Sequence, residues 1–353
     1  MEVNLKRIPI AISFAALALA GCQQGGGAGG QAGGRTQIRI VGSSTVYPFA
    51  TAVAEQFVRN NPGFKAPIIE STGTGGGMKL FCAGVGTQHP DIENASRRIK
   101  KSEFEDCAKN GVKQVIEIPI GIDGLALIEG NDAQPLALTQ ADIYKAVAAN
   151  PFGKPNTATT WKDVNPSLPA VKIQVYGPPP TSGTRDAFAE LILEKGCESD
   201  PAMKALKEQD KDKAKEICTK IREDGVYVEG GENDNLLVQK VAANTGTIGI
   251  MGYSFLEENT DKVRAIPIAG VAPTSDSIAS FKYPGARPLF VYVKGDHLSA
   301  VPGIREFVAE FAKAWTPGGY LSRKGLIPLP ADKLAAAEQA AKELKPMTPD
   351  GLE

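Results

Sequence analysis

The chain has 353 residues, of which 42% are hydrophobic and 22% charged, and its formal net charge is −1. This composition is typical of a globular protein and is ample for a large core and two domains. Because nucleic-acid-binding domains usually carry a basic excess, the balanced charge argues against nucleic acid as a partner, although it does not exclude a small anion as the ligand.

The first residues have the pattern of an export signal. Lys6 and Arg7 give a positive start, and the mainly apolar run that follows is shorter than the roughly 20 residues that a membrane-spanning helix needs. The run ends in LAGC at residues 19–22, which resembles the lipobox of bacterial lipoproteins. In that family the signal is cut before the cysteine, which is then acylated. We therefore expect residues 1–21 to be a signal peptide and Cys22 to carry lipid, with a plain signal peptide or a short anchor as the alternative.

Residues 22–35 are expected to form a tether. Between Cys22 and Arg35 the chain reads QQGGGAGGQAGG, which has no side chain able to build a core. Two or three acyl chains on Cys22 would hold the following domain stably at a membrane. Gln23 is not the aspartate that commonly retains lipoproteins at the inner membrane. A lipid-anchored periplasmic protein is therefore predicted, with outer-membrane attachment if the cell has two membranes.

Four cysteines remain, at positions 82, 107, 197 and 218. In an exported chain they suggest two disulfides, and pairing of sequence neighbours (Cys82 with Cys107, Cys197 with Cys218) is the simplest of the three connectivities. A metal site is the rival interpretation. Because the chain has only two histidines and no CxxC spacing, no metal or other cofactor is expected.

A strand, a loop of glycine and hydroxyl residues, and a helix follow the tether. Residues 36–41 (TQIRIV) alternate roughly as a strand does. The helix is indicated by apolar side chains four residues apart, at Phe49, Val53 and Phe57. Between the strand and the helix lies the segment 42–45 (GSST).

The same theme recurs twice. A strand at 67–71 precedes the segment 73–77 (GTGGG) and a short helix predicted to start near Met78. A strand at 171–176 precedes a proline-rich loop and the segment 182–184 (SGT). The helix after it has three apolar side chains on one face: Phe188, Leu191 and Ile192.

This alternation predicts an α/β architecture with largely parallel sheets. In such sheets ligands bind beyond the carboxyl ends of the strands, where the next helices start. Helix N-termini suit an anion because their N–H groups are unpaired, and Ser or Thr there can donate a hydroxyl hydrogen. Helix capping alone explains most single cases, but three segments in this position predict one shared anion site.

The remaining elements are predicted from shorter patterns. Residues 138–149 indicate a helix, and residues 161–163 lie in a predicted loop. Residues 201–224 are highly charged and predict an exposed helical excursion, for which a solvated face is the default interpretation. The C-terminal part is predicted to contain a strand at 288–293 and helices at 301–315 and 331–344.

Two arginines are candidates for charge recognition. Arg185 follows the segment 182–184, and Arg97 follows Asn94-Ala95-Ser96. Either guanidinium could bind two oxygens of a tetrahedral anion. A structural ion pair is the alternative for each, and Asp186 is an obvious neighbour for Arg185.

The chain resembles the periplasmic phosphate-binding proteins of the Pst importer family from Gly42 to about Leu329. Each matching stretch is modest, but their order is specific. The stretches are 42–48 (GSSTVYP), 73–79 (GTGGGMK), 91–97 (DIENASR), 161–166 (WKDVNP), 182–188 (SGTRDAF), 246–254 (GTIGIMGYS) and 283–293 (YPGARPLFVYV).

The resemblance implies a monomeric α/β protein of two lobes with its ligand cleft between them. Such a protein closes on inorganic phosphate and delivers it to the permease subunits of an ABC importer. Residues 36–119 and 264–353 would form lobe 1, and residues 120–263 lobe 2. The chain would cross the hinge near 118–122 and again within 253–264.

The resemblance also implies the phosphate contacts, which are hydroxyl and backbone N–H groups at helix starts together with one or two arginines. The predicted residues are Ser44, Thr45, Thr74, Ser96, Arg97, Ser182, Gly183, Thr184 and Arg185. The arginine that some members place four residues before Ser-Gly-Thr is Pro178 here, so Arg185 is expected to take its role. Positions 96–97 also lack the aspartate that accepts a proton from phosphate in those members. Rejection of sulfate needs an acceptor that faces the proton of phosphate, because sulfate has no proton to give near neutral pH. Since the sequence assigns no such acceptor, sulfate and arsenate stay open as alternative ligands.

Enzymatic activity is not expected. Residues 73–79 superficially suggest a P-loop, but Leu80 stands where Ser or Thr should bind magnesium. No nucleophile elbow surrounds Ser43 or Ser44, because position 46 is valine. A surface protein acting in adhesion or phosphate sensing is the other class left open.

Overall fold

The computed structural model describes residues 35–180, 182–231 and 234–352. Within them, nine strands form a mixed sheet in the order β2-β1-β3-β9-β4-β7-β5-β6, with β8 paired to β4 off this path. The strands are β1 Arg39–Gly42, β2 Ile68–Ser71, β3 Ile92–Ala95, β4 Val115–Gly130, β5 Val175–Gly177, β6 Tyr227–Glu229, β7 Ile248–Gly252, β8 Val263–Ala265 and β9 Ala286–Lys294. The predicted signal peptide, the lipidation site Cys22 and residues 22–34 of the predicted tether lie outside the described residues.

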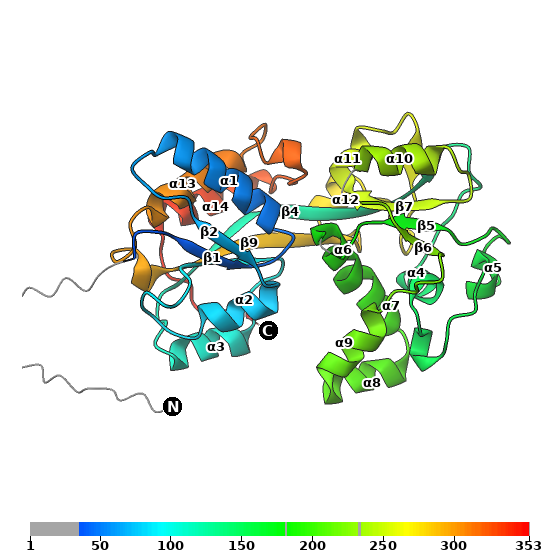
Figure 1. Ribbon diagram of the computed structural model, residues 1–353, viewed down its shortest axis with the longest axis horizontal. Coiled ribbons are helices and arrows are strands. Elements are labelled where there is room, and N and C mark those ends of the chain that lie inside the picture. The colour runs from blue at the N-terminus through cyan, green and yellow to red at the C-terminus, as the bar shows by residue number, and fades with distance from the viewer. Residues whose placement is uncertain (1–34, 181, 232–233, 353) are drawn as a thin grey trace, which may run out of the picture. The chain divides into compact units, whose positions relative to one another are not determined.

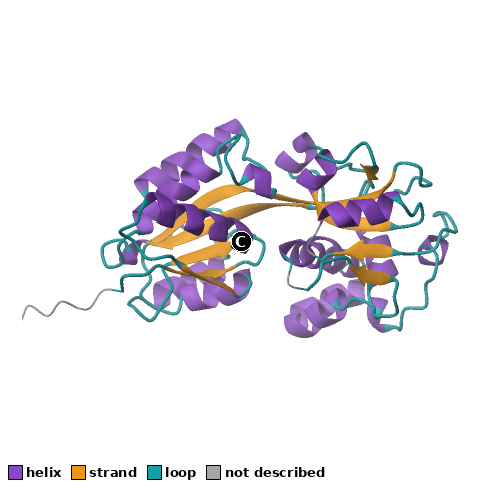
Figure 2. Ribbon diagram, turned by 45° about the horizontal axis from the view of Figure 1, so that its top comes forward, coloured by secondary structure: helices purple, strands orange, loops and turns teal. Residues whose placement is uncertain are grey.

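The described elements form two lobes that share the strand β4 (Figure 1). Residues 115–124 of β4 pair with β9, and β3, β1 and β2 continue this part of the sheet. Residues 125–129 of β4 pair with β7, which leads to β5 and β6 in the other lobe. Figure 2 shows long strands passing from one lobe into the other. The structure therefore has the two lobes that the resemblance implied.

The prediction of largely parallel sheets is only half right. β1 pairs in parallel with β2 and β3, and β5 does so with β6 and β7, but the pairs that β4 and β9 make are antiparallel. The sequence did not indicate β4, because its apolar run contains Pro119, Gly121 and Gly124, which usually argue against a strand interior. The register of β4 against β9 shifts between Pro119 and Gly121, so the proline sits at an irregularity of the pairing.

The predicted division of the chain at 119/120 and 263/264 stays a prediction. β8 begins at Val263 and pairs with the end of β4, and Ile268 bridges to Leu138. The residues just after 263 therefore lie with the second lobe. The pairing of Ala286 with Gly124 starts the return along β9, which favours a second crossing near Gly285.

The helices of the first lobe cover both faces of its sheet, with α1, α13 and α14 on one side and α2 and α3 on the other (Figure 1). Their bounds are α1 Tyr47–Asn60, α2 Thr74–Phe81, α3 Lys101–Lys109, α13 Ile304–Ala314 and α14 Ala331–Glu343. Alternate residues of β9 enter different cores: Val291 packs in the cluster with α1, and Tyr292 in the cluster with α2. The predicted helical face of Phe49, Val53 and Phe57 is buried.

The second lobe contains α4 Gln140–Val147, α5 Trp161–Val164, α6 Gly183–Ala187, a π-helix at Phe188–Leu193, α7 Glu194–Cys197, α8 Pro201–Gln209, α9 Lys211–Thr219, α10 Asp234–Ala242, α11 Tyr253–Glu257 and α12 Ser275–Ala279. One loop prediction is corrected here. Residues 161–164 form a short helix, not a loop, because Thr160 and Asp163 make a capping box and Trp161 is buried. The charged stretch 201–224 is helical as predicted: α8 buries no residue, whereas α9 buries Ala214 and Cys218.

Two disulfides join sequence neighbours. Cys82 at the end of α2 is bonded to Cys107 of α3, and Cys197 of α7 is bonded to Cys218 of α9. The second bond ties α9 to the helix that follows the segment 182–184. Over the described ranges, the structure contains no helix with the length and apolar character to cross a membrane.

Candidate functional site

The parallel strands of the first lobe bring two of the three hydroxyl-and-glycine segments and the candidate pair Ser96-Arg97 to one edge of the sheet. In register, Gly42 at the end of β1 lies opposite Ser71 of β2 and Asn94 of β3. The Ser43 N–H donates to the Asn94 carbonyl at 2.7 Å, so the chain leaving β1 stays against the end of β3. The segments 43–45, 72–74 and 95–97 therefore leave the sheet side by side, as expected for a site at the carboxyl ends of parallel strands.

Thr74 and Ser96 meet at this edge. Their hydroxyl oxygens are 3.0 Å apart, and the Ser96 N–H donates to Thr74 Oγ1 at 3.1 Å. Both residues are buried. α2 begins at Thr74, not near Met78 as predicted, because the glycines after Thr74 are part of the helix. The Thr74 hydroxyl consequently stands at the start of a helix.

The predicted segments of the two lobes contact each other directly. Thr45 Oγ1 donates to the Gly183 carbonyl at 3.2 Å, and Ser44 Oγ donates to Asp186 Oδ2. A Cβ added to Gly183 would lie 2.5 Å from Thr45 Cα, so only glycine permits this approach. Ser182 Oγ accepts the Thr184 N–H at 3.2 Å and caps α6, so capping is at least one role of that hydroxyl.

The two candidate arginines have different surroundings. Arg185 Nη1 donates to the Pro178 carbonyl at 3.0 Å, and its guanidinium carbon lies 4.7 Å from the ring centre of Tyr227. Asp186, the expected ion-pair partner of Arg185, instead accepts from Ser44 of the other lobe. Arg97 does form the alternative ion pair, because its two Nη atoms donate to the carboxylate of Glu103 at 2.9 and 2.7 Å.

Arg287 is a site residue that the sequence reasoning missed. Its Nη2 donates to Thr45 Oγ1 at 2.5 Å, its Nη1 contacts Glu190 at 2.6 Å, and its Nε contacts Asp123 at 3.1 Å. The side chain is buried, and it links the first lobe to the helix after the segment 182–184. A charged residue beside the apolar strand 288–293 was the available signal.

Glu93 is a second residue of interest that was not singled out. It is buried on β3, and neither carboxylate oxygen has a hydrogen-bond partner among the residues that the structure describes. Its carboxyl group lies against both Gly42 and Gly77, where either glycine would clash with it if it carried a Cβ. Burial, helped by the charge of Glu103, raises the pKa of Glu93 well above its ordinary value.

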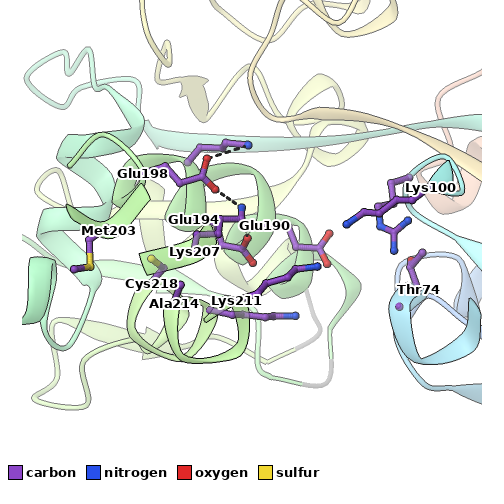
Figure 3. A pocket seen from close by; sticks show the side chains of 14 residues that line it. Thr74, Lys100, Glu190, Glu194, Glu198, Met203, Lys207, Lys211, Ala214 and Cys218 are labelled. Carbon is purple, nitrogen blue, oxygen red and sulfur yellow. Dashed lines mark hydrogen bonds and ion pairs between the residues drawn. The ribbon is translucent and has the colours of Figure 1, made fainter. Parts of the chain in front are cut away.

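A cavity of about 290 Å³ lies beside Thr74 and Arg97 and is lined by residues of both lobes (Figure 3). The first lobe contributes Thr74, Gly75, Arg97 and Lys100, whereas the other lining residues come from the second lobe. Six basic and three acidic side chains line the cavity, so its charge suits an anion. Within residues 35–180, 182–231 and 234–352, no group of His, Cys, Asp and Glu is arranged to hold a metal ion.

Comparison with known proteins agrees with this architecture. The family described as "PBP superfamily domain" matches residues 28–314. "Protein SphX" of Synechococcus elongatus is 34% identical over 88% of this chain and 83% of its own length. "Phosphate-binding protein PstS" of Staphylococcus saprophyticus is 31% identical over 83% of this chain and 81% of its own length.

Solved structures give the same result. The crystal structure titled "a possible phosphate binding protein" from Planctomyces limnophilus is 29% identical, covers 87% of this chain and 98% of its own, and has a TM-score of 0.71. An ABC-type phosphate transport receptor of Vibrio cholerae, at 22% identity, covers 82% of this chain and 99% of its own with a TM-score of 0.56, and supports the fold alone. The predicted two-lobed binding-protein fold is therefore confirmed, and the chain belongs to the PBP superfamily and, within it, to the PstS family of phosphate-binding proteins.

Proposed function

We propose that this protein binds inorganic phosphate between its two lobes and delivers it to the permease subunits of an ABC importer. The relatives named for phosphate binding support the ligand. The observation that carries the proposal is the direct contact between hydroxyl-and-glycine segments of the two lobes, at Thr45 and Gly183. A tetrahedral anion held there would be bound by hydroxyl and N–H groups from both sides, so that binding favours lobe closure.

The proposed phosphate site keeps the residues predicted from the sequence and adds one. Ser44, Thr45, Thr74, Ser96, Ser182, Gly183 and Thr184 supply hydroxyl and N–H groups, and Arg97 and Arg185 supply charge. Arg287 is added because its guanidinium already donates to the Thr45 hydroxyl. The bonds of Arg97 to Glu103 and to the Arg98 carbonyl use three of its five N–H groups, so Arg97 can bind phosphate and keep its ion pair.

We also propose that the mature chain is held at a membrane through lipid on Cys22 and works in the periplasm as a monomer. In this proposal the segment from Cys22 to Gly34 is the tether that connects the lipid to the two lobes. Catalysis is not part of the proposal, because phosphate is bound and released unchanged.

The test is calorimetric titration of the mature domain, refolded after denaturing dialysis to remove carried-over ligand. We expect tight one-to-one binding of phosphate at the site between the segments, and phosphate affinity at least tenfold lower in Thr184→Ala and in Arg185→Ala, since each removes contacts to a charged ligand. Thr157→Ala, an exposed threonine of the same lobe, is the matched control and should bind like the wild type. Sulfate and arsenate are titrated in parallel.

Unchanged phosphate affinity in both site variants would overturn the site assignment. An absence of phosphate heat together with an unchanged melting temperature would overturn the ligand. Sulfate binding in its place would keep the fold and change the transported ion.

A further inference from the structure

The cavity between the lobes contains lysines that have no carboxylate partner. Lys207 pairs with Glu194 and Glu198, and Arg97 pairs with Glu103. Three other lysines of the cavity form no ion pair with any described residue: Lys100, Lys211 and Lys215. Positive charge at the cavity is therefore only partly balanced by the protein itself.

Two of these lysines come from different lobes and line the same cavity. Lys100 precedes α3 in the first lobe, and Lys211 is the first residue of α9 in the second. Burial, the adjoining ammonium group of Lys211 and the charge of Arg97 together lower the pKa of Lys100. The ammonium groups of Lys100 and Lys211 repel each other in this partly buried place. An anion bound between them would be attracted by both groups and would offset their repulsion.

We propose that Lys100 and Lys211 bind a second phosphate ion, at a subsite that bridges the lobes and adjoins Thr74 and Arg97 of the proposed primary site. The identity of the ion rests on the proposed function. Ammonium groups donate to phosphate oxygens without fixed geometry, which suits a weaker site that exchanges its ion rapidly. Lys215, one helical turn after Lys211 on α9, adds charge to the same cavity.

The size and lining of the cavity favour a small inorganic anion. Its volume of about 290 Å³ leaves room for a phosphate with water but not for a folded partner. The lining includes no aromatic side chain on which a nucleotide base could stack, and its apolar members are Met203, Ala214 and Cys218. An ion held here would stand beside Thr74 and Arg97 of the proposed primary site.

The test is equilibrium dialysis of the refolded mature domain against radiolabelled phosphate over a wide concentration range at low ionic strength. We expect the wild type to bind one phosphate tightly and a second more weakly. Lys100→Gln and Lys211→Gln should each weaken the second site tenfold or more and keep the first. The controls Lys101→Gln and Lys213→Gln remove the same charge from exposed neighbours of each lysine and should keep both sites. Circular dichroism checks that each variant is folded.

The outcomes separate this inference from the proposed function. If the wild type binds one phosphate only, or if the second site persists in both Lys100→Gln and Lys211→Gln, the subsite is wrong and the proposed function stands. If the wild type binds no phosphate at all, the proposed function fails first. Loss of the second site in the control variants as well would reduce the effect to net charge and would also overturn the subsite.

Discussion

At the scale of single residues, Glu93 is the group whose burial has the clearest consequence. Its carboxyl group is enclosed by α2 and the ends of β1 and β3, with no hydrogen-bond partner in the described part of the chain, and burial raises its pKa well above the ordinary 4.5. The folded protein therefore keeps a proton that the unfolded chain releases as the pH rises past that value. Because the folded state then binds more protons, the free energy of unfolding falls with rising pH until the raised pKa is reached.

We predict that Glu93→Gln removes this loss of stability, because glutamine resembles the protonated acid and does not ionise. The gain over wild type should grow by about 1.4 kcal/mol for each pH unit over which only the folded state keeps the proton, and should vanish near pH 4. Urea unfolding between pH 4 and 8 measures it. Glu105→Gln, on the exposed side of α3, should leave the pH dependence unchanged. A wild-type slope in Glu93→Gln would refute the assignment.

The contacts of individual residues were only partly predictable from the sequence. Strand-loop-helix patterns indicated where the hydroxyl segments lie, and the structure does bring Thr74 to Ser96 and Thr45 to Gly183; their role in phosphate binding stays a prediction. Neighbours in a helix point in different directions, which is why Asp186 contacts the other lobe and not Arg185. The contacts of Arg287 join residues 97 to 242 positions apart, and no local pattern encodes them.

At the scale of elements, α2 shows how glycine serves close packing within a helix. A Cβ on Gly77 would lie 2.5 Å from Gly42 Cα and would also clash with the Glu93 carboxylate, whereas a Cβ on Gly76 would meet its nearest neighbour, Thr72, at 3.6 Å. Because glycine disfavours helices, the sequence pattern predicts that the helix starts only near Met78. The small size of glycine is instead what allows α2 to lie against β1 and β3.

We therefore predict opposite effects for two adjacent substitutions. Gly77→Ala should destabilise the protein by about 1–3 kcal/mol through overpacking. Gly76→Ala should stabilise it by roughly 0.5–1 kcal/mol, because alanine loses less entropy in a helix. Thermal and urea unfolding of the two variants measure the difference, and each serves as the control for the other. Equal effects of the same sign would show that α2 does not pack as closely on β1 as described.

Among the other elements, the longest strand, β4, was not predicted from the sequence. β4 has an apolar run that is interrupted by Pro119, Gly121 and Gly124, and it gains its strand character from pairing with β9 and β7. The helices were predicted more reliably, because spacing such as that of Phe49, Val53 and Phe57 is set by the local period. Strand pairing depends on distant partners, so the antiparallel centre of the sheet could not be predicted from local alternation.

At the scale of the whole two-lobed body, β4 and β9 form the connection, and Arg287 lies at their junction. It contacts Asp123 of β4, Thr45 of the first lobe and Glu190 on the π-helix of the second. The sequence located the two lobes through the family resemblance. The resemblance placed the return crossing within 253–264, whereas the pairing of Ala286 with Gly124 favours one near Gly285, so the division of the chain stays a prediction. Of the bonds around Arg287, the one to Glu190 joins residues of the two lobes without being part of either core.

This bond leads to a prediction about closure. The Glu190 side chain is 42% exposed, so its pairing with Arg287 contributes at most about 1 kcal/mol. Glu190→Gln should therefore shift the lobes toward the open state by up to about fivefold and raise the phosphate Kd by the same factor, because only the closed-competent fraction binds. Asp123 remains to neutralise Arg287, so the fold should be retained.

Small-angle scattering and calorimetry test the prediction together. Without phosphate, the radius of gyration of Glu190→Gln should exceed that of the wild type, and at saturating phosphate the two should coincide, because the ligand restores the closed state. Glu208→Gln, an exposed carboxylate on α8, controls for the change in net charge. If Glu190→Gln weakens phosphate binding while its scattering matches the wild type at every phosphate concentration, Glu190 acts on the ligand itself through the cavity that it lines, and the bond to Arg287 does not govern closure.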